Sequence, residues 1–118
     1  MEMARVANET GLVLSEAFAY RNHPLTARMK QVIESELGKI QHIEARFRFI
    51  LLNFSNVRYR YDLAGGALMD AGCYPVSMVR YLTGAEPKVT GARARLFKPD
   101  VDSGMEANLE FPNGSTGH

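Results

Sequence analysis

The feature that most constrains the fold is an alternating run near the end of the chain. Residues 105–111 alternate apolar and polar side chains, and this period of two predicts a half-buried strand. The Asn113-Gly114 pair follows, and it favours a two-residue hairpin turn. Because a hairpin turn joins two strands, we expect a returning strand of which only the first residues precede His118. We interpret residues 1–118 as a single partial domain of a longer polypeptide, with a floppy tail after a complete domain as the alternative.

A second alternating segment places apolar and basic side chains on opposite faces. Phe47 and Phe49 share one face with Ile43 and Ala45, while polar residues such as Arg46 share the other. The strand that contains the first alternating run is predicted to cover residues 102–111. Three more strands are predicted at residues 12–20, 39–52 and 87–99, and the last of these forms a hairpin with residues 102–111 around residues 99–103.

Helical spacing and end signals predict three helices. Pro24 suits a first helical position that Asn22 or His23 caps. Gly38 and Gly84 are natural helix ends. The predicted helices cover residues 1–10, 24–37 and 67–84.

The order of elements is therefore helix, strand, helix, strand, helix, strand, strand. Closely spaced final strands require antiparallel pairing, so we predict an α+β fold with an open mixed, partly antiparallel sheet and helices on one face. The other face is either solvated or covered by another subunit, and it carries Arg46, Arg48, Arg93 and Arg95.

Composition limits the classes of function. The chain is 46% apolar and 23% charged, with a net charge of +1, so no global field attracts nucleic acid or acidic lipid. No run of 18 apolar residues and no signal peptide are present. Cys73 is the single cysteine, which leaves no intrachain disulfide and no cysteine zinc cluster. We expect a cytoplasmic protein without a membrane, nucleic-acid or metal partner.

Arginines mixed with aromatic residues raise one alternative, a surface for single-stranded nucleic acid. The RFRF stretch at residues 46–49 is the best example. Strand alternation sends its arginines one way and its phenylalanines the other, which makes the rings core residues rather than a stacking platform.

An acid and a phenol share one helix face within the stretch LAGGALMDAGCYP, residues 63–75. Asp70 and Tyr74 are four residues apart, so they lie above one another. Their neighbours are apolar, and a carboxylate there needs partners. Pro75 removes one helical hydrogen bond. From spacing alone, a capping Asp beside a packed Tyr is the commoner explanation for such a pair, and a catalytic site is the alternative. Cys73 fits a small core residue.

Two motifs together resemble the second domain of the Gfo/Idh/MocA oxidoreductase family of glucose–fructose oxidoreductase and inositol dehydrogenases. They are SEAFAYRNHP at residues 15–24 and GGALMDAGCYPVSMVRYL at residues 65–82. The resemblance implies a preceding Rossmann domain that binds NAD or NADP, and a Glu-Lys-Pro motif with a catalytic lysine at the domain junction. Residues 1–10 resemble the helix that follows that motif. The chain is then expected to bind no nucleotide and transfer no hydride alone.

The resemblance also implies roles at the paired motif. Asp70 matches the family's motif acid near the substrate. Tyr74 lies where members carry His or Tyr, the group that exchanges a proton with the substrate oxygen. A tyrosine rather than a histidine resembles the dihydrodiol and sugar 1-dehydrogenase branch.

Further residues are candidate ligand contacts. Gly65 and Gly66 allow an unusual turn or the close approach of a substrate. Arg21 and His23 are candidate cofactor contacts, although His23 is equally suited to capping a helix. The loop before the glycine pair either binds a hydroxylated or anionic substrate or is merely solvated, and its candidates are Arg58, Tyr59 and Arg60.

We therefore predict the substrate-binding and oligomerisation domain of an NAD(P)-dependent oxidoreductase that acts on a sugar, polyol or diol. Its expected partners are a small-molecule substrate, the Rossmann domain and further copies of itself through the sheet. A non-catalytic ligand-binding or scaffold protein built on the same domain is the alternative.

Overall fold

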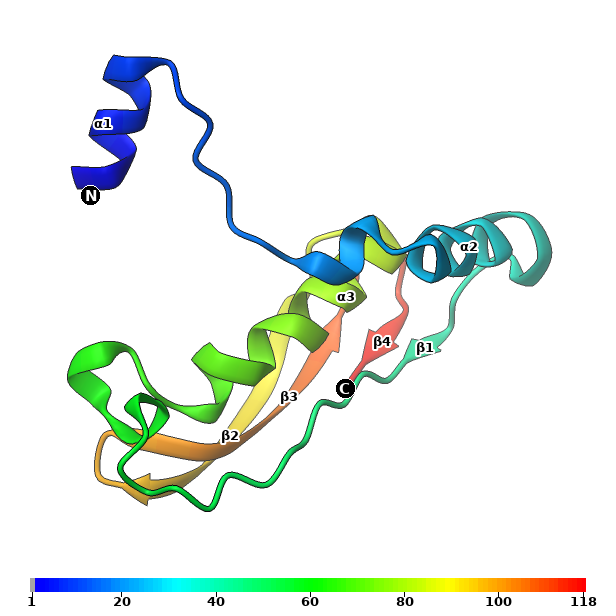
Figure 1. Cartoon of the computed structure of the whole chain (residues 1–118). Coiled ribbons are helices and arrows are strands. Elements are labelled where there is room, and N and C mark those ends of the chain that lie inside the picture. The colour runs from blue at the N-terminus through cyan, green and yellow to red at the C-terminus, as the bar shows by residue number, and fades with distance from the viewer. Residues whose placement is uncertain (1) are drawn as a thin grey trace.

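A computed structural model describes residues 2–118. A single mixed sheet carries one helix, α3, across it, and a second helix, α2, precedes the short strand β1 along the chain (Figure 1). Wide π turns, Ile33–Leu37 and Leu68–Gly72, extend α2 at its end and α3 at its start. The helices are α1 (Glu2–Thr10), α2 (Pro24–Val32) and α3 (Cys73–Thr83), and the strands are β1 (His42–Ile43), β2 (Lys88–Lys98), β3 (Val101–Glu110) and β4 (Thr116–Gly117).

The sheet has the strand order β1-β4-β3-β2. β2 and β3 form a long antiparallel hairpin, β3 and β4 are antiparallel, and β1 runs parallel to β4. The predicted turn at Asn113-Gly114 is closed by the Phe111 amide, which donates to the Ser115 carbonyl over 2.9 Å. The prediction of an α+β fold with a mixed, partly antiparallel sheet is confirmed.

The core lies where α3 crosses the sheet. Val79 of α3 and Phe111 are each 2% exposed and pack with Leu109 of β3. Alternation along β3 produces this contact, because Leu109 faces the helix while Glu110 faces away. Partly buried side chains complete the cluster, namely Ile43, Ala45, Ala85 and Ala107.

The helix boundaries follow their local signals. The His23 ring accepts a hydrogen bond from the Leu25 amide at 3.2 Å and caps α2 directly before Pro24. Gly38, with φ of 71°, ends the extended α2, and Gly84, with φ of 66°, ends α3. The wide turn before α3 lies next to Pro75, which has no N–H for a regular helical bond. The predicted helices are confirmed within residues 2–118, and Met1 of the first lies outside the described residues.

Two strand predictions need correction. Residues 12–18 are not a strand, because no described strand lies beside them, and Leu12 and Val13 are 70% and 94% exposed. In the segment predicted at 39–52, only His42–Ile43 form a strand, β1, in the described residues. The apolar patterns were present in both segments, but a strand also needs a neighbouring edge to satisfy its backbone groups.

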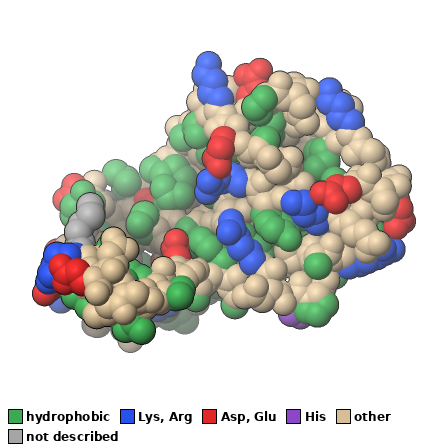
Figure 2. Space-filling view, turned by 90° about the horizontal axis from the view of Figure 1, so that it is seen from above, with side chains coloured by type: hydrophobic (Ala, Val, Ile, Leu, Met, Phe, Trp, Pro, Cys, Tyr) green, Lys and Arg blue, Asp and Glu red, His purple; other side chains and the backbone are tan. Residues whose placement is uncertain are grey.

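The described chain is open rather than compact. It exposes 8984 Å², whereas a folded monomer of 13.2 kDa exposes about 6,400 Å². Its radius of gyration is 17.0 Å, against about 13.5 Å for a compact domain of this length. α1 stands away from the sheet (Figure 1). Figure 2 shows apolar side chains exposed between interspersed basic and acidic ones.

Candidate active site

The predicted acid lies in an ion pair at the start of the long helix. The carboxylate of Asp70 accepts a hydrogen bond from Nε of Arg58 at 2.7 Å. The Asp70 side chain is 24% exposed and that of Arg58 is 45% exposed. Asn56 also positions Arg58, because its side-chain oxygen accepts from the Arg58 amide at 3.1 Å. The loop and the helix therefore present one joined acid–guanidinium pair.

The predicted phenol lies one turn further along, in an aromatic group. The Tyr74 ring meets the Phe18 ring edge-on at 5.5 Å and the Phe47 ring at 5.8 Å. Tyr74 is 40% exposed. Phe18 comes from the extended segment before α2 and Phe47 from the segment after β1, so three distant parts of the chain fix the orientation of this ring.

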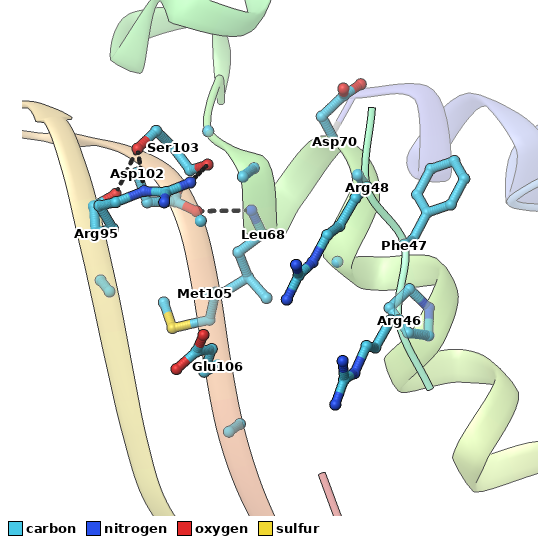
Figure 3. Close-up of a pocket in the computed structure, with 18 of the residues that line it drawn as sticks. Arg46, Phe47, Arg48, Leu68, Asp70, Arg95, Asp102, Ser103, Met105 and Glu106 are labelled. Atoms are coloured by element: carbon cyan, nitrogen blue, oxygen red, sulfur yellow. Dashed lines mark hydrogen bonds between the residues drawn. The ribbon is translucent and has the colours of Figure 1, made fainter. Parts of the chain in front are cut away.

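The acid and the phenol do not line one common cavity in this structure. A cavity of about 1010 Å³ lies between α3, β3 and the segment after β1, and Arg58 and Asp70 are among its lining residues. Tyr74 is not among them. Figure 3 shows Asp70 pointing away from the middle of this cavity. The catalytic roles of Asp70 and Tyr74 therefore stay predictions.

The loop before the glycine pair is internally bonded. The Tyr59 hydroxyl donates to the Leu51 carbonyl at 2.6 Å. The guanidinium of Arg60 donates to the Asp62 carboxylate at 3.2 and 2.5 Å. This hydrogen bond holds the pKa of Asp62 below its ordinary value. Arg60 and Asp62 are mostly exposed, so a substrate role for this loop stays a prediction.

The glycine pair allows backbone and side chain to approach closely. Gly65 is packed against the loop, since a Cβ there would lie 2.6 Å from the Arg60 carbonyl. Gly66 has φ of 123°, and a Cβ there would lie 2.2 Å from Oδ1 of Asp102. The other oxygen of Asp102 accepts from the Leu68 amide at 2.8 Å (Figure 3). The space beside Gly66 is thus occupied by Asp102, which caps the start of the helix from β3.

The two candidate cofactor contacts are engaged within the domain. Arg21 donates to the buried Ser77 hydroxyl at 3.2 Å, and the Tyr20 hydroxyl donates to the same oxygen at 2.6 Å. The Arg21 guanidinium also lies over the Phe18 ring at 5.6 Å. His23 caps α2, as its alternative interpretation proposed. A cofactor role for Arg21 and His23 stays a prediction.

Within residues 2–118, no three His, Cys, Asp or Glu side chains gather closely enough to hold a metal ion. None of the helices in this range is long and apolar enough to cross a bilayer.

Comparison with known proteins identifies the family of this chain. The model of the GFO/IDH/MocA C-terminal domain matches residues 26–118. The chain belongs to the GFO/IDH/MocA family. The resemblance stated from the two motifs is therefore confirmed.

Two proteins show the nature of the GFO/IDH/MocA relatives. D-xylose 1-dehydrogenase (NADP(+)) 2 of Haloferax volcanii is 38% identical over 109 residues, which cover 92% of this chain and 34% of that protein. The crystal structure of KijD10, a 3-ketoreductase from Actinomadura kijaniata in complex with NADP and TDP-benzene, matches with a TM-score of 0.87. It is 31% identical, and the match covers 98% of this chain and 36% of that one.

A third GFO/IDH/MocA relative is trans-1,2-dihydrobenzene-1,2-diol dehydrogenase of Mus musculus. It is 29% identical over 118 residues, which cover 98% of this chain and 35% of that protein. The chain thus spans about a third of the length of the relatives it matches.

Sequence reasoning missed the residues that support this candidate site from a distance. Asp102 caps the helix that carries Asp70, and Ser77 anchors the segment that carries Phe18. Both contacts join residues at least 34 positions apart. The one local signal was the glycine pair, which indicated a close approach without identifying what approaches.

Proposed function

We propose that this chain is the substrate-binding domain of an NAD(P)-dependent oxidoreductase acting on a sugar, polyol or diol. The observation that carries the proposal is the match of residues 26–118 to the GFO/IDH/MocA C-terminal domain. The names of its relatives point the same way, since they include a D-xylose dehydrogenase, a 3-ketoreductase and a dihydrodiol dehydrogenase. These reactions interconvert a hydroxyl and a carbonyl group.

Within this function, Tyr74 is the group that exchanges a proton with the substrate oxygen. The nicotinamide cofactor supplies the hydride, so the protein must move a proton and stabilise charge at that oxygen. A free phenol titrates near pH ~10, and a neighbouring cation lowers that value. The family resemblance assigns this cation to the lysine of the Glu-Lys-Pro motif. Phe18 and Phe47 hold the ring in a fixed orientation for the transfer.

Asp70 and Arg58 form the polar side of the substrate site. The bond between them is charge-assisted, which makes it stronger than a neutral hydrogen bond. It fixes the guanidinium on the same helix–loop junction that carries Tyr74, one turn away. Arg58 can then bind a hydroxyl or an anionic group of the substrate, with Tyr59, Arg60, Gly65 and Gly66 shaping the surrounding loop. Arg21 and His23 lie toward the cofactor side.

The function is tested by assaying the full-length oxidoreductase against sugars, polyols and diols with NAD⁺ and with NADP⁺. We expect reduction of at least one cofactor with a member of these classes, and no turnover by the 118-residue chain alone. Full-length protein that binds a sugar without turnover would support the non-catalytic alternative. Turnover by the isolated chain would contradict the assignment of cofactor binding to another domain.

The polar pair is tested with Asp70→Asn in the full-length enzyme. The change removes the charge that holds Arg58, so we expect kcat/KM to fall by about tenfold. Glu86→Gln is the matched control, because Glu86 also pairs with an arginine but at the other end of α3. Equal activity of Asp70→Asn and Glu86→Gln would restrict Asp70 to a structural role.

A further inference from the structure

β4 is a short strand that leads into the large cavity. It lies between β1 and β3 but pairs with each over two residues only. Beyond it, the extended segment of residues 45–51 and the strand β3 face each other across the cavity of about 1010 Å³. In Figure 1, β4 lies between β1 and β3, and the C-terminus directly follows it. Figure 3 shows Arg46 and Arg48 reaching from the segment into it.

Among the described residues, both long sides of the groove are backbone edges with no strand partner beyond Ala45 on one side and Leu109 on the other. The ladder beside β1 ends with two bonds, in which the His118 amide donates to the Ile43 carbonyl at 3.0 Å and the Ala45 amide donates to the His118 carbonyl at 3.1 Å. Within the described residues, β3 pairs on this side only at Leu109 and Glu110. Unpaired edges of this kind bind additional strands.

The ladder fixes which backbone groups point into the groove. In a parallel ladder, every second residue of a strand directs its backbone N–H and C=O toward the same neighbouring strand. Ile43 and Ala45 direct theirs toward β4, so the amides of Phe47 and Phe49 face the groove beyond it. In the antiparallel ladder, the Phe111 amide donates to the Ser115 carbonyl at 2.9 Å. Every second residue before Phe111 directs its backbone groups toward the same side. The amides of Ala107 and Met105 therefore also face the groove.

The same register determines which side chains of a strand that continues β4 would face α3 and which would face the open side. Gly117 lies against Phe111 and Ile43 on the helix side, whereas the His118 ring lies 3.8 Å from the Glu44 carboxylate on the open side. The first and third residues after His118 would therefore face α3. The first would lie between Ala45 and Ala107, two small side chains.

The third and fourth positions are the most distinctive. The third lies between Phe47 and Met105, and it favours an apolar side chain. The fourth lies on the open side between Arg48 and Gly104, and a Cβ on Gly104 would be 3.3 Å from the Arg95 guanidinium. Two arginines at one position favour an acidic side chain. The second position lies between Arg46 and Glu106 and favours a neutral polar one.

We propose that this groove is the seat of a β-strand that continues β4 directly beyond His118, parallel to the segment after β1 and antiparallel to β3. Its side chains are apolar toward α3, with an acid four residues after His118. The inference rests on the proposal that the chain is one domain of a longer oxidoreductase. It completes a continuous sheet beneath α3 and covers the apolar side of Phe47, whose ring contacts Tyr74.

The test extends the chain after His118 with Val-Thr-Val-Asp-Val and measures amide hydrogen exchange by NMR. We expect exchange at Phe47, Phe49, Met105 and Ala107 to slow by about tenfold or more. The amides of Arg46 and Arg48 should not change, because they point to the opposite edge. The control extension, Thr-Val-Asp-Val-Val, has the same composition in the opposite phase and should give no such protection. Slow exchange at Val79 in α3 reports that each variant is folded.

Three results would overturn the inference. They are the absence of protection with the in-phase extension, equal protection with both extensions, and protection of the same amides in the unextended chain that grows with its concentration. The last result would assign the groove to a second copy. The measurement uses neither nucleotide nor substrate, so its failure leaves the proposed catalytic function standing.

Discussion

Gly66 and Asp102 together determine how the helix that carries the candidate site begins. The backbone of Gly66 has φ of 123° and lies against one oxygen of Asp102, while the other oxygen accepts from the Leu68 amide. An aspartate at a helix start satisfies a free amide and stabilises the positive end of the helix dipole. The position of Asp70 therefore depends on a residue of β3.

Substitution of Gly66 tests this arrangement. Gly66→Ala introduces a Cβ that would lie 2.2 Å from Asp102 at a φ that alanine rarely adopts, so we expect the free energy of unfolding to fall by about 3 kcal/mol or more. Gly84→Ala is the control, because it also has positive φ but meets nothing within 4 Å. Its expected cost is about 1–2 kcal/mol. Urea denaturation measures both, and equal losses would contradict the close contact with Asp102.

The sequence predicted the special character of the glycine pair but not its partner. Local patterns identify positions where the chain needs freedom, and Gly66 is one of them. Asp102 lies 34 residues from Leu68, and nothing in the intervening sequence specifies their contact. For the same reason, the pairing of Asp70 with Arg58 and the packing of Tyr74 on Phe18 required the fold.

At the scale of elements, an ion pair fastens the end of α3 to the connection before β2. The guanidinium of Arg80 donates from Nε to the Glu86 carboxylate at 3.0 and 2.8 Å. This hydrogen bond holds the pKa of Glu86 below its ordinary value of 4.5. A carboxyl whose pKa is lowered in the folded state stabilises the fold above its unfolded pKa. That stabilisation is lost as the pH falls through the folded pKa.

The pH dependence of Glu86→Gln checks this element. At pH 7 we expect a lower Tm, by about 1–3 °C, because exposed ion pairs contribute little. The difference from the parent should be smaller at pH 3 than at pH 7, because protonation of Glu86 removes the charge that pairs with Arg80. Thermal unfolding followed by circular dichroism at the two pH values measures it. A difference in Tm that persists or grows in acid would mean that Glu86→Gln acts through something other than the Arg80–Glu86 ion pair.

Most elements could be predicted because their signals are local. Caps, proline and glycine mark α2 and α3, and alternation marks β3. Residues 12–18 and 44–52 could not be assigned in this way. An alternating or apolar pattern shows that a segment is suited to a strand, but it does not show whether a neighbouring strand is present to pair with it. In the structure, the first segment runs between α1 and the rest of the chain (Figure 1) with Leu12 and Val13 exposed, and residues 45–51 of the second line the groove.

At the scale of the whole molecule, the surface is too large and too apolar for an independent small domain. The exposed area of 8984 Å² exceeds the expected value by more than a third. Large apolar side chains such as Val13, Ile50 and Leu52 are more than three-quarters exposed. Such surfaces are normally covered by another domain or subunit. We propose that the preceding domain and a second subunit cover them in the full-length enzyme.

Self-association of the 118-residue chain tests that coverage. We expect a dimer or larger oligomer in sedimentation velocity at tens of micromolar, because the open sheet face and its unpaired edges are adhesive. Added salt should not dissociate an oligomer that is held together by apolar surface. A monomer that persists at the highest attainable concentration would contradict the prediction.

The most direct measurement is the turnover of Tyr74→Phe in the full-length enzyme. Removing the hydroxyl leaves the ring on Phe18 and Phe47 but eliminates the proposed proton donor, so kcat should fall by about 10²–10⁴-fold. Tyr81→Phe on the same helix, whose ring lies under Lys30, should stay close to the parent. Turnover of Tyr74→Phe within a few-fold of the parent would contradict the proton-transfer role and the catalytic site built on it.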